Sequence, residues 1–210
     1  MASITLGPLG QASGKLAHVV YFTKGDKTFF RQASSSKKSP SSDKQLETQA
    51  KFKLMQNFLG KVSRFVQKGY SSKKVKSSSY NEAFRVNVKQ AFTGTLPNLE
   101  LDYVKIQLTK GPLSAVSSLT VSNNAEDLTL NWFYSPADVK SNADDKICVL
   151  VYHPEKDLVL QYDRIASRSD KTATINLPPD FVGEEVLTWA VFENETATQV
   201  SSSLFTRVSI

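Results

Sequence analysis

The sequence predicts an α+β N-terminal module, built from a β-hairpin, two helices and a strand, followed by an all-β sandwich of the immunoglobulin-like or fibronectin type. Three observations predict this arrangement. Apolar residues recur at helical spacing in residues 42–94, seven short runs rich in β-branched and aromatic residues fill residues 113–210, and the charge balance changes sign between the two parts. The turn at residues 110–112 then sets predicted domains of residues 1–112 and 113–210.

The first predicted element is a β-hairpin. Its strands, Leu16–Phe22 and Lys27–Gln32, are rich in β-branched and aromatic residues, and Gly25 between them suits a tight turn. A Ser- and Lys-rich stretch follows over Ala33–Lys44, where low apolar content and Pro40 predict an exposed connection.

The second element is the clearest helix of the chain. Ser42 and Gln45 have the spacing of a capping box, in which each side chain satisfies a free backbone donor at the helix start. The apolar face repeats at intervals of three and four residues and comprises Phe52, Met55, Leu59, Val62 and Val66. Gly69 is the predicted end, because glycine readily takes the left-handed conformation that closes helices.

A shorter helix and a strand complete the first module. After a second Ser- and Lys-rich linker, Ser71–Ser79, the residues Ser79 and Glu82 form another capping box, and Gly94 is the predicted helix end. The apolar face of this helix comprises Phe84, Val88 and Ala91. The segment Leu99–Leu108 alternates in polarity, which predicts a half-buried strand. Its inward side comprises Val104, Ile106 and Leu108.

The second module is predicted to contain only strands. Seven short strands with turn-rich connections in about 100 residues are typical of an immunoglobulin-like or fibronectin-type sandwich. The candidates are Ser118–Ser122, Leu128–Tyr134, Lys146–His153, Leu158–Tyr162, Thr172–Leu177, Val186–Glu193 and Ser203–Ser209. The third candidate is almost continuously apolar, which favours a central position. A single Cys, Cys148, excludes the disulfide of an antibody-type domain.

The glycines near the start raise the question of a phosphate-binding loop. Such a loop places four residues between two glycines and then Lys-Ser or Lys-Thr, whereas Gly10 and Gly14 enclose three residues and Leu16 follows Lys15. The segment that follows is predicted as a strand rather than a helix. We therefore expect Gly7, Gly10 and Gly14 to serve backbone geometry.

No cluster of residues predicts catalysis or metal binding. His18 and His153 lie in different modules, without a Cys/His pair at ligand spacing. Cys148 is predicted to be a buried small hydrophobe on the opposite face of its strand from His153. Carboxylates of the second module lie in turns and at strand ends, so a glycosidase-type pair stays open but none is selected. We expect no enzyme, cofactor, metal or small-molecule substrate; an enzyme of another type would need a deep pocket with convergent polar groups.

The charges divide unevenly along the chain. Residues 1–112 contain 19 Lys and Arg against 6 Asp and Glu, whereas residues 113–210 contain 7 against 14. This asymmetry indicates two modules with different partners or halves that attract each other, and solubility from Lys is the plain alternative. Candidate contacts to a polyanion or a partner are Lys37, Lys38, Lys61, Arg64, Lys68, Lys73, Lys74 and Lys76. Arg31, Tyr70 and Tyr80 could add stacking to such a surface.

The sequence offers little that would direct the chain to a membrane. MASITLGPLG has no basic region and no apolar stretch of signal length, and nowhere do 18 apolar residues run together. One Cys permits no intrachain disulfide, which suits a reducing compartment. We expect cytoplasmic residence and no membrane partner, while export by a specialised machine would leave no such mark.

Several stretches resemble a known family. They include GPLGQASGKLAHVV, the Lys-Gly turn that follows with Arg31, QAKF, KGY, YNEAFRVNVKQAFTGTLPNLELDYVKIQLTKGPL and, more loosely, DKICVLVYHPEK and ATINLPPDFVGEEV. The chain resembles small Bacteroidota proteins catalogued as domain of unknown function 6266. It departs at Ala17, where the family usually has Gly, and at SPSSDKQ, where the family has a Thr-Pro helix entry. The resemblance implies a common fold and a bacterial origin, and it carries no activity, cofactor or catalytic residue.

Two functions follow from the sequence as expectations. The first is a non-enzymatic structural or interaction protein, such as an assembly component, in which oppositely charged modules of two copies pair head to tail or a different protein binds. The second is a polyanion- or nucleic-acid-binding protein that acts through the basic N-terminal module. No recognised nucleic-acid-binding motif accompanies the basic residues.

Overall fold

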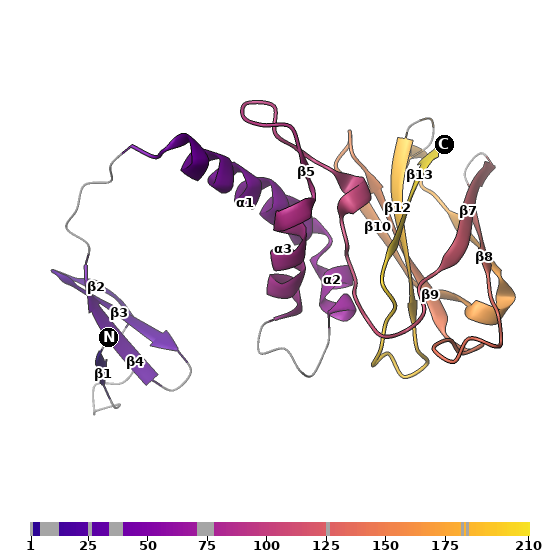
Figure 1. The fold of residues 1–210 in the computed structure, drawn as a ribbon, viewed down its shortest axis with the longest axis horizontal. Helices are drawn as coiled ribbons and strands as arrows, with labels where there is room; N and C mark the ends of the chain where they lie inside the picture. Colours follow the sequence, from indigo (N-terminus) through magenta and orange to yellow (C-terminus); the bar gives the residue numbers. More distant parts are fainter. Residues whose placement is uncertain are drawn as a thin grey trace. The chain divides into compact units, whose positions relative to one another are not determined.

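The computed structural model describes residues 2–4, 13–24, 27–33, 40–70, 78–124, 127–181, 183 and 185–210 (Figure 1). The chain forms two compact units, Met1–Ser42 and Asp43–Ile210. This division differs from the predicted boundary after residue 112, for a reason that lies in the core of the second unit.

The N-terminal unit is a four-stranded antiparallel sheet in the order β1-β4-β3-β2. The strands are β1 (Ala2–Ile4), β2 (Gly14–Leu16), β3 (Val19–Lys24) and β4 (Lys27–Gln32). The predicted hairpin is confirmed as β3–β4. The predicted first strand is divided, because Ala17 takes a positive φ of 50° and starts a turn before β3. Gly14 has φ 128°, which confirms its role in backbone geometry, while Gly7 and Gly10 lie outside the described residues.

The second unit begins with three helices, α1 (Asp43–Lys61), α2 (Ser63–Gly69) and α3 (Ser79–Gln90). The predicted first helix is therefore divided, at Val62, which leaves helical geometry with φ −99° and ψ 15°. Met55, Leu59, Val62 and Val66 of the predicted apolar face are fully buried. Phe52 is the exception: it remains 50% exposed and contacts Phe84 of α3, with ring centroids 4.8 Å apart.

The start of α3 was predicted one residue too late. The cap is Ser78, whose Oγ accepts a hydrogen bond from the Asn81 backbone N–H at 3.3 Å. Glu82 pairs instead with Arg85 on the exposed side of the helix. The side of α3 that faces the protein also carries a buried polar residue, Asn87, which the apolar spacing did not indicate.

Neither glycine predicted to end a helix does so by a left-handed conformation. At Gly69 an added Cβ would lie 2.3 Å from Thr109 Cγ2, so the residue is small because another segment packs against it. Gly94 does have φ 73°, but α3 has already ended at Gln90. It lies between the short strands β5 (Phe92–Thr93) and β6 (Glu100–Leu101).

The predicted strand Leu99–Leu108 was wrong over most of its length. After β6 the chain forms a 3₁₀ turn, η1 (Tyr103–Lys105), which leaves Val104 61% exposed. Ile106 and Leu108 are buried as predicted. After β6 the segment joins no sheet: the Asn87 amide pairs with the backbone of Gln107, and the Ser203 hydroxyl accepts the Leu108 N–H.

All seven predicted strands of the sandwich are confirmed. One sheet has the order β11-β8-β7 and the other the order β10-β9-β12-β13. The strands are β7 (Ser117–Asn124), β8 (Asp127–Phe133), β9 (Lys146–His153), β10 (Leu158–Ser167), β11 (Thr172–Asn176), β12 (Glu185–Glu193) and β13 (Leu204–Ser209). Two further 3₁₀ turns, η2 (Arg168–Asp170) and η3 (Pro179–Phe181), flank β11. The third strand, β9, is central as predicted, with β10 on one side and β12 on the other.

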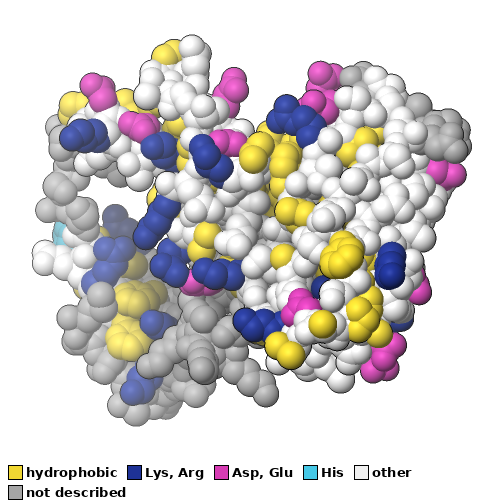
Figure 2. All heavy atoms as spheres, turned by 45° about the vertical axis from the view of Figure 1, so that its right-hand side comes forward, with side chains coloured by type: hydrophobic (Ala, Val, Ile, Leu, Met, Phe, Trp, Pro, Cys, Tyr) yellow, Lys and Arg dark blue, Asp and Glu magenta, His cyan; other side chains and the backbone are white. Residues whose placement is uncertain are grey.

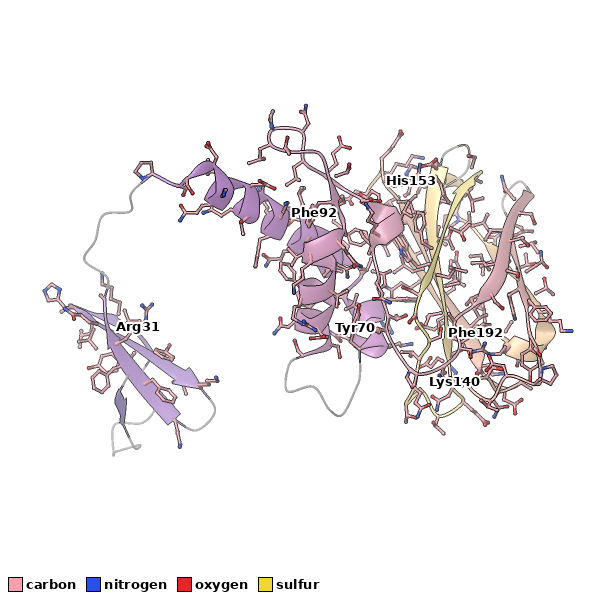
Figure 3. All side chains as sticks on the ribbon, viewed as in Figure 1. Arg31, Tyr70, Phe92, Lys140, His153 and Phe192 are labelled. Atoms are coloured by element: carbon pink, nitrogen blue, oxygen red, sulfur yellow. The ribbon has the colours of Figure 1, made fainter. Side chains whose placement is uncertain are left out.

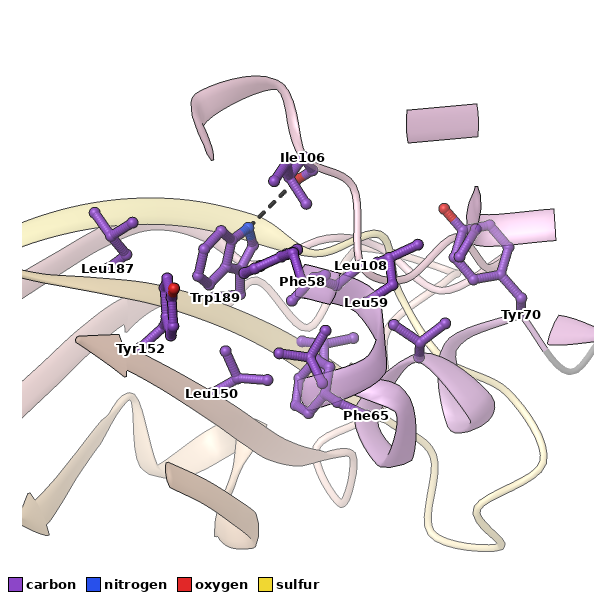
Figure 4. Close-up of a cluster of buried hydrophobic side chains, with 14 of the residues drawn as sticks. Phe58, Leu59, Phe65, Tyr70, Ile106, Leu108, Leu150, Tyr152, Leu187 and Trp189 are labelled. Atoms are coloured by element: carbon purple, nitrogen blue, oxygen red, sulfur yellow. Dashed lines mark hydrogen bonds between the residues drawn. The ribbon is translucent and has the colours of Figure 1, made fainter. Parts of the chain in front are cut away.

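The four-stranded sheet of the sandwich, β10-β9-β12-β13, is covered on both faces. Side chains of β9 alternate between two cores: Ile147, Val149 and Val151 pack toward the three-stranded sheet. Cys148, Leu150 and Tyr152 pack toward the helices (Figure 4). Three layers result, with the helices on one side of the four-stranded sheet and the three-stranded sheet on the other (Figure 1).

Phe58 of α1 shows how the helices join the sandwich. Its ring lies 5.4–5.9 Å from those of Tyr152 and Trp189 on the sheet and 5.6 Å from that of Tyr103. The Trp189 indole N–H donates to the Ile106 carbonyl at 3.2 Å (Figure 4). Because burying each large apolar side chain contributes about 1.5–3 kcal/mol, the helices cannot separate from this sheet without a large loss. This shared core explains why the second unit starts at Asp43 rather than after residue 112.

Candidate functional site

The register of the N-terminal sheet sorts its aromatic side chains onto two faces. Tyr21 lies opposite Phe30, and Phe22 lies opposite Phe29. Because neighbouring residues of a strand point to opposite sides, each face of the sheet carries one aromatic pair. The ring centroids are 6.3 Å apart in the first pair and 5.6 Å in the second. All four rings are partly exposed.

One face is basic. The register places Lys15 opposite Val20, Val20 opposite Arg31, and Lys24 opposite Lys27, all on the side of Phe22 and Phe29 (Figure 3 labels Arg31). We call this set the basic face: Lys15, Val20, Phe22, Lys24, Lys27, Phe29 and Arg31. Its four cations are exposed, and none of them makes an ion pair within the described part of the chain.

The other face carries no charge on β2, β3 or β4. We call it the uncharged face: Gly14, Leu16, Val19, Tyr21, Thr23, Thr28, Phe30 and Gln32. Leu16 on the edge strand β2 is 70% exposed. The sheet therefore separates an uncharged surface from a cationic one within residues 14–32.

The helix residues predicted as partner contacts are partly engaged within the chain. Lys61 of α1 pairs with Asp157 before β10, and that carboxylate also accepts the Tyr152 hydroxyl at 2.9 Å. The hydrogen bond from Lys61 lowers the pKa of Asp157 below its usual value. Lys68 of α2 pairs with Asp163 of β10 at 3.0 Å. Basic helices and acidic sandwich thus attract each other inside one chain.

Among the other predicted contact residues, the structure describes only Arg64. Arg64 of α2 is exposed. Lys37, Lys38, Lys73, Lys74 and Lys76 lie outside the described residues. Tyr70, predicted to stack, is instead buried and donates to the Gln107 carbonyl at 3.0 Å. In Figure 2 basic and acidic side chains are interspersed over the visible surface.

The single Cys lies in a closed, polar corner beneath α2. Its Sγ accepts from the Arg164 backbone N–H at 3.4 Å and donates to the carboxylate of buried Glu193 at 3.5 Å. Arg164 lies 3.7 Å from that carboxylate. A cavity of ≈ 10 Å³ beside them has room for about one water molecule. Cys148 is buried, as predicted, and burial raises its pKa to about 12.

A second buried polar group holds the far end of the sandwich. Arg168 and Asp145 form an ion pair at 3.0 Å with both side chains almost fully buried. The guanidinium lies 3.7 Å above the Phe192 ring and donates to the Ser114 carbonyl, while the Trp132 indole donates to the Arg168 carbonyl. Burial lowers the pKa of Arg168. The group ties three loops together, and no spacing in the sequence indicated it.

The two histidines lie in different units of the chain. His18 is exposed in the turn before β3. His153 is buried against Phe181, on the opposite face of β9 from Cys148, as predicted. Its Nδ1 accepts the Lys156 backbone N–H at 3.3 Å. No group of three or more His, Cys, Asp or Glu that could hold a metal occurs among the described residues.

The loops at one end of the sandwich border an open groove of ≈ 570 Å³. Its polar side chains hold the loops themselves. Asn194 accepts the backbone N–H groups of Thr198 and Gln199 and donates to the Thr196 hydroxyl, at 2.8–2.9 Å. Asp145 is held by Arg168.

Across the described helices, none is long and apolar enough to cross a membrane.

A family model matches residues 11–207, which is nearly the whole chain. The chain belongs to DUF6266, a family of unknown function. The predicted resemblance is confirmed at the level of the family. Because this match includes both compact units from residue 11 onward, the N-terminal sheet is part of the DUF6266 region and not an addition to it.

Two solved structures match about half of this DUF6266 chain. The FN1–FN3 domains of chicken CNTN1 match 48% of it at 9% identity, with a TM-score of 0.35 and 32% of their own chain covered. The spore cortex lytic enzyme SleM of Clostridium perfringens matches 48% at 14% identity, with a TM-score of 0.30 and 29% covered. The DUF6266 chain thus spans about a third of these proteins. No curated protein is significantly similar to it.

Proposed function

We propose that this DUF6266 protein is a non-enzymatic bacterial interaction protein, a component of an assembly whose contacts are made by the N-terminal sheet. Residues 43–210 form the scaffold, and a second copy of the chain covers the uncharged face. A cytoplasmic setting belongs to the same proposal and rests on sequence features alone. The observation that carries the proposal is an uncharged sheet face whose edge residue, Leu16, is 70% exposed.

The uncharged face leaves apolar area exposed, chiefly at Leu16, although Thr28 on the same face is buried. A sheet is stable in water when its apolar face packs against another layer. The described part of the N-terminal unit is a single layer, with Val19, Tyr21 and Phe30 partly exposed. Because this face carries no charge on β2–β4, two identical faces can meet without repulsion, as a two-fold symmetric dimer requires.

The polar groups of the second unit support a scaffold role. Asp145, Arg168, Asn87 and Asn194 all bond to residues of the fold, and the cysteine is buried with a raised pKa. Lys61 and Lys68 also pair with carboxylates of the sandwich in the same chain. Head-to-tail contacts between copies would need the same charges.

Light scattering across protein and salt concentrations tests the proposal on the full chain. We expect the wild type to self-associate, with association strengthened by kosmotropic salt because apolar burial drives it. Leu16→Ser should shift the protein toward the monomer, whereas Val139→Ser, a 96% exposed apolar residue of the scaffold, should not. A monomer under every condition would contradict the proposal. Association that weakens as salt rises would instead indicate head-to-tail charge pairing.

A further inference from the structure

We propose that the basic face of the N-terminal sheet binds single-stranded nucleic acid. The basic face lies on the other side of the sheet from the uncharged face, which a second copy of the chain covers. The proposal therefore stands independently of the proposed function. It assigns Phe22 and Phe29 to base stacking and Lys15, Lys24, Lys27 and Arg31 to phosphate contacts.

The two aromatic rings of the basic face form a stacked pair, which we call the platform. The rings of Phe22 and Phe29 are nearly parallel, with an interplanar angle of 19° and centroids 5.6 Å apart. Both are partly exposed, and they lie on adjacent central strands, β3 and β4. Stacking on exposed aromatic side chains of a sheet is how several small folds hold unpaired bases, because every base has a π-face.

Cations flank the platform at both ends. Lys24 and Lys27 lie opposite each other at the hairpin end, and Arg31 and Lys15 lie on either side of Val20 at the other end. Four residues separate the two levels along β3, which at 3.3 Å per residue is about 13 Å. A backbone that crosses the two Phe rings therefore meets positive charge on entering and on leaving.

The Lys24–Lys27 pair favours an anionic partner on its own. Like charges directly opposite on neighbouring strands destabilise a sheet. Six Lys and Arg stand against one acidic residue, Asp26, in residues 1–42, so the N-terminal unit as a whole has few carboxylates to neutralise them. Phosphates that bind between the two ammonium groups would remove this repulsion.

Other anions fit the basic face less well. A duplex presents its phosphates but keeps its bases stacked inside, so it has no use for the Phe pair. An acidic peptide meets the cations but likewise leaves the rings unused. The described part of this sheet is a single layer, whereas small-molecule sites are concave. Unpaired bases on a phosphate backbone engage both kinds of side chain.

Fluorescence anisotropy on the full chain tests the proposal, with labelled single-stranded DNA and RNA of about 12 nucleotides, a duplex of the same sequence, and poly-glutamate as a competitor. At about 50 mM salt we expect the single strands to bind more tightly than the duplex, with affinity falling steeply as salt rises. The double variant Lys24→Gln/Lys27→Gln should lower the slope of log K against log salt by about 1.4, because each single-strand phosphate contact contributes about 0.7. Lys53→Gln/Lys89→Gln, with the same charge change on exposed helix positions, should leave the slope unchanged.

A matched pair of variants tests the stacking. Phe29→Leu and Phe30→Leu remove the same atoms from neighbouring residues of β4 that point to opposite faces. Phe29→Leu should weaken single-strand binding roughly ten-fold or more, and Phe30→Leu should change it less than about two-fold. Because both residues are partly exposed neighbours on β4, a folding defect would appear in both variants. The proposal is overturned by absence of binding at about 50 mM salt, by equal effects of the two variants, or by a duplex or poly-glutamate that binds as tightly as the single strand.

Discussion

The side-chain amide of Asn87 pairs with the backbone of Gln107 in both directions. Asn87 Oδ1 accepts the Gln107 N–H and Asn87 Nδ2 donates to the Gln107 carbonyl, each at 2.8 Å. Nδ2 also donates to the Ala83 carbonyl at 2.9 Å. One fully buried amide on α3 thus does for the segment after η1 what a neighbouring strand does inside a sheet.

Loss of this amide should destabilise the second unit. Asn87→Ala leaves the Gln107 N–H without a partner, while the Gln107 carbonyl keeps the Tyr70 hydroxyl, so we expect the free energy of unfolding to fall by about 1–3 kcal/mol. Asn87→Asp keeps the acceptor and loses the donor. Urea denaturation measures the effect, and Asn57→Ala on the exposed side of α1 is the control. A cost below about 1 kcal/mol for Asn87→Ala would show that water replaces the amide.

Two helix glycines should respond in opposite directions to Ala. At Gly69 the new Cβ would lie 2.3 Å from Thr109 Cγ2 and 2.8 Å from its Cα, so Gly69→Ala should destabilise by about 1–3 kcal/mol. At Gly60, inside α1, nothing lies within 4 Å of the added atom, so Gly60→Ala should stabilise by about 0.5–1 kcal/mol. Both free energies come from the same urea titration. Equal signs would contradict the close contact between α2 and Thr109.

The single thiol should report unfolding of the shared core. Burial raises the pKa of Cys148 to about 12 from an unfolded value near 8.5, so the neutral thiol favours the folded state. This contribution is complete below about pH 8.5 and is lost as pH rises toward 12. At pH 8 we expect a disulfide reagent to react slowly with native protein and rapidly once urea unfolds it. Fast labelling of the native chain would show that α2 opens without global unfolding.

Replacing Ala17 by Gly should stabilise the N-terminal sheet. The φ of 50° at Ala17 lies in the left-handed region, where an L side chain costs about 1 kcal/mol relative to Gly. Ala17→Gly should therefore slow amide exchange in β3 about five-fold at the residues Val19–Lys24. The control is Ala33→Gly, at a position without positive φ, where no slowing is expected. Unchanged exchange in Ala17→Gly would mean that the turn bears no strain.

Alternation and turn chemistry are local signals, and what they predicted was largely right. All seven sandwich strands and the β3–β4 hairpin follow from the sequence. The packing of the helices against the sandwich could not be predicted in this way, because helix periodicity shows which face of a helix is apolar and not what covers that face. One signal was present: β9 and β12 are apolar at nearly every position, which indicates a sheet buried on both faces.

The strand prediction at Leu99–Leu108 failed for a similar reason. Alternation at Ile106 and Leu108 reports burial on one side, whereas a strand also needs a partner for its backbone, and here Asn87 and Ser203 supply it. The basic face could have been predicted. With a turn at residues 25–26, the hairpin register alone pairs Phe22 with Phe29 and Lys24 with Lys27. The Arg168–Asp145 pair depends on loops far apart in sequence, so no local pattern marks it.

Hydrogen–deuterium exchange of the full chain tests the central claim most directly: contacts are made by the N-terminal sheet, while residues 43–210 are the scaffold. Exchange is compared at low and high protein concentration, and then with excess single-stranded oligonucleotide. We predict that protection rises in Gly14–Leu16, Val19–Lys24 and Lys27–Gln32 and stays the same in β7–β13. Protection gained instead in the sandwich loops at residues 139–145 and 194–199 would contradict the account.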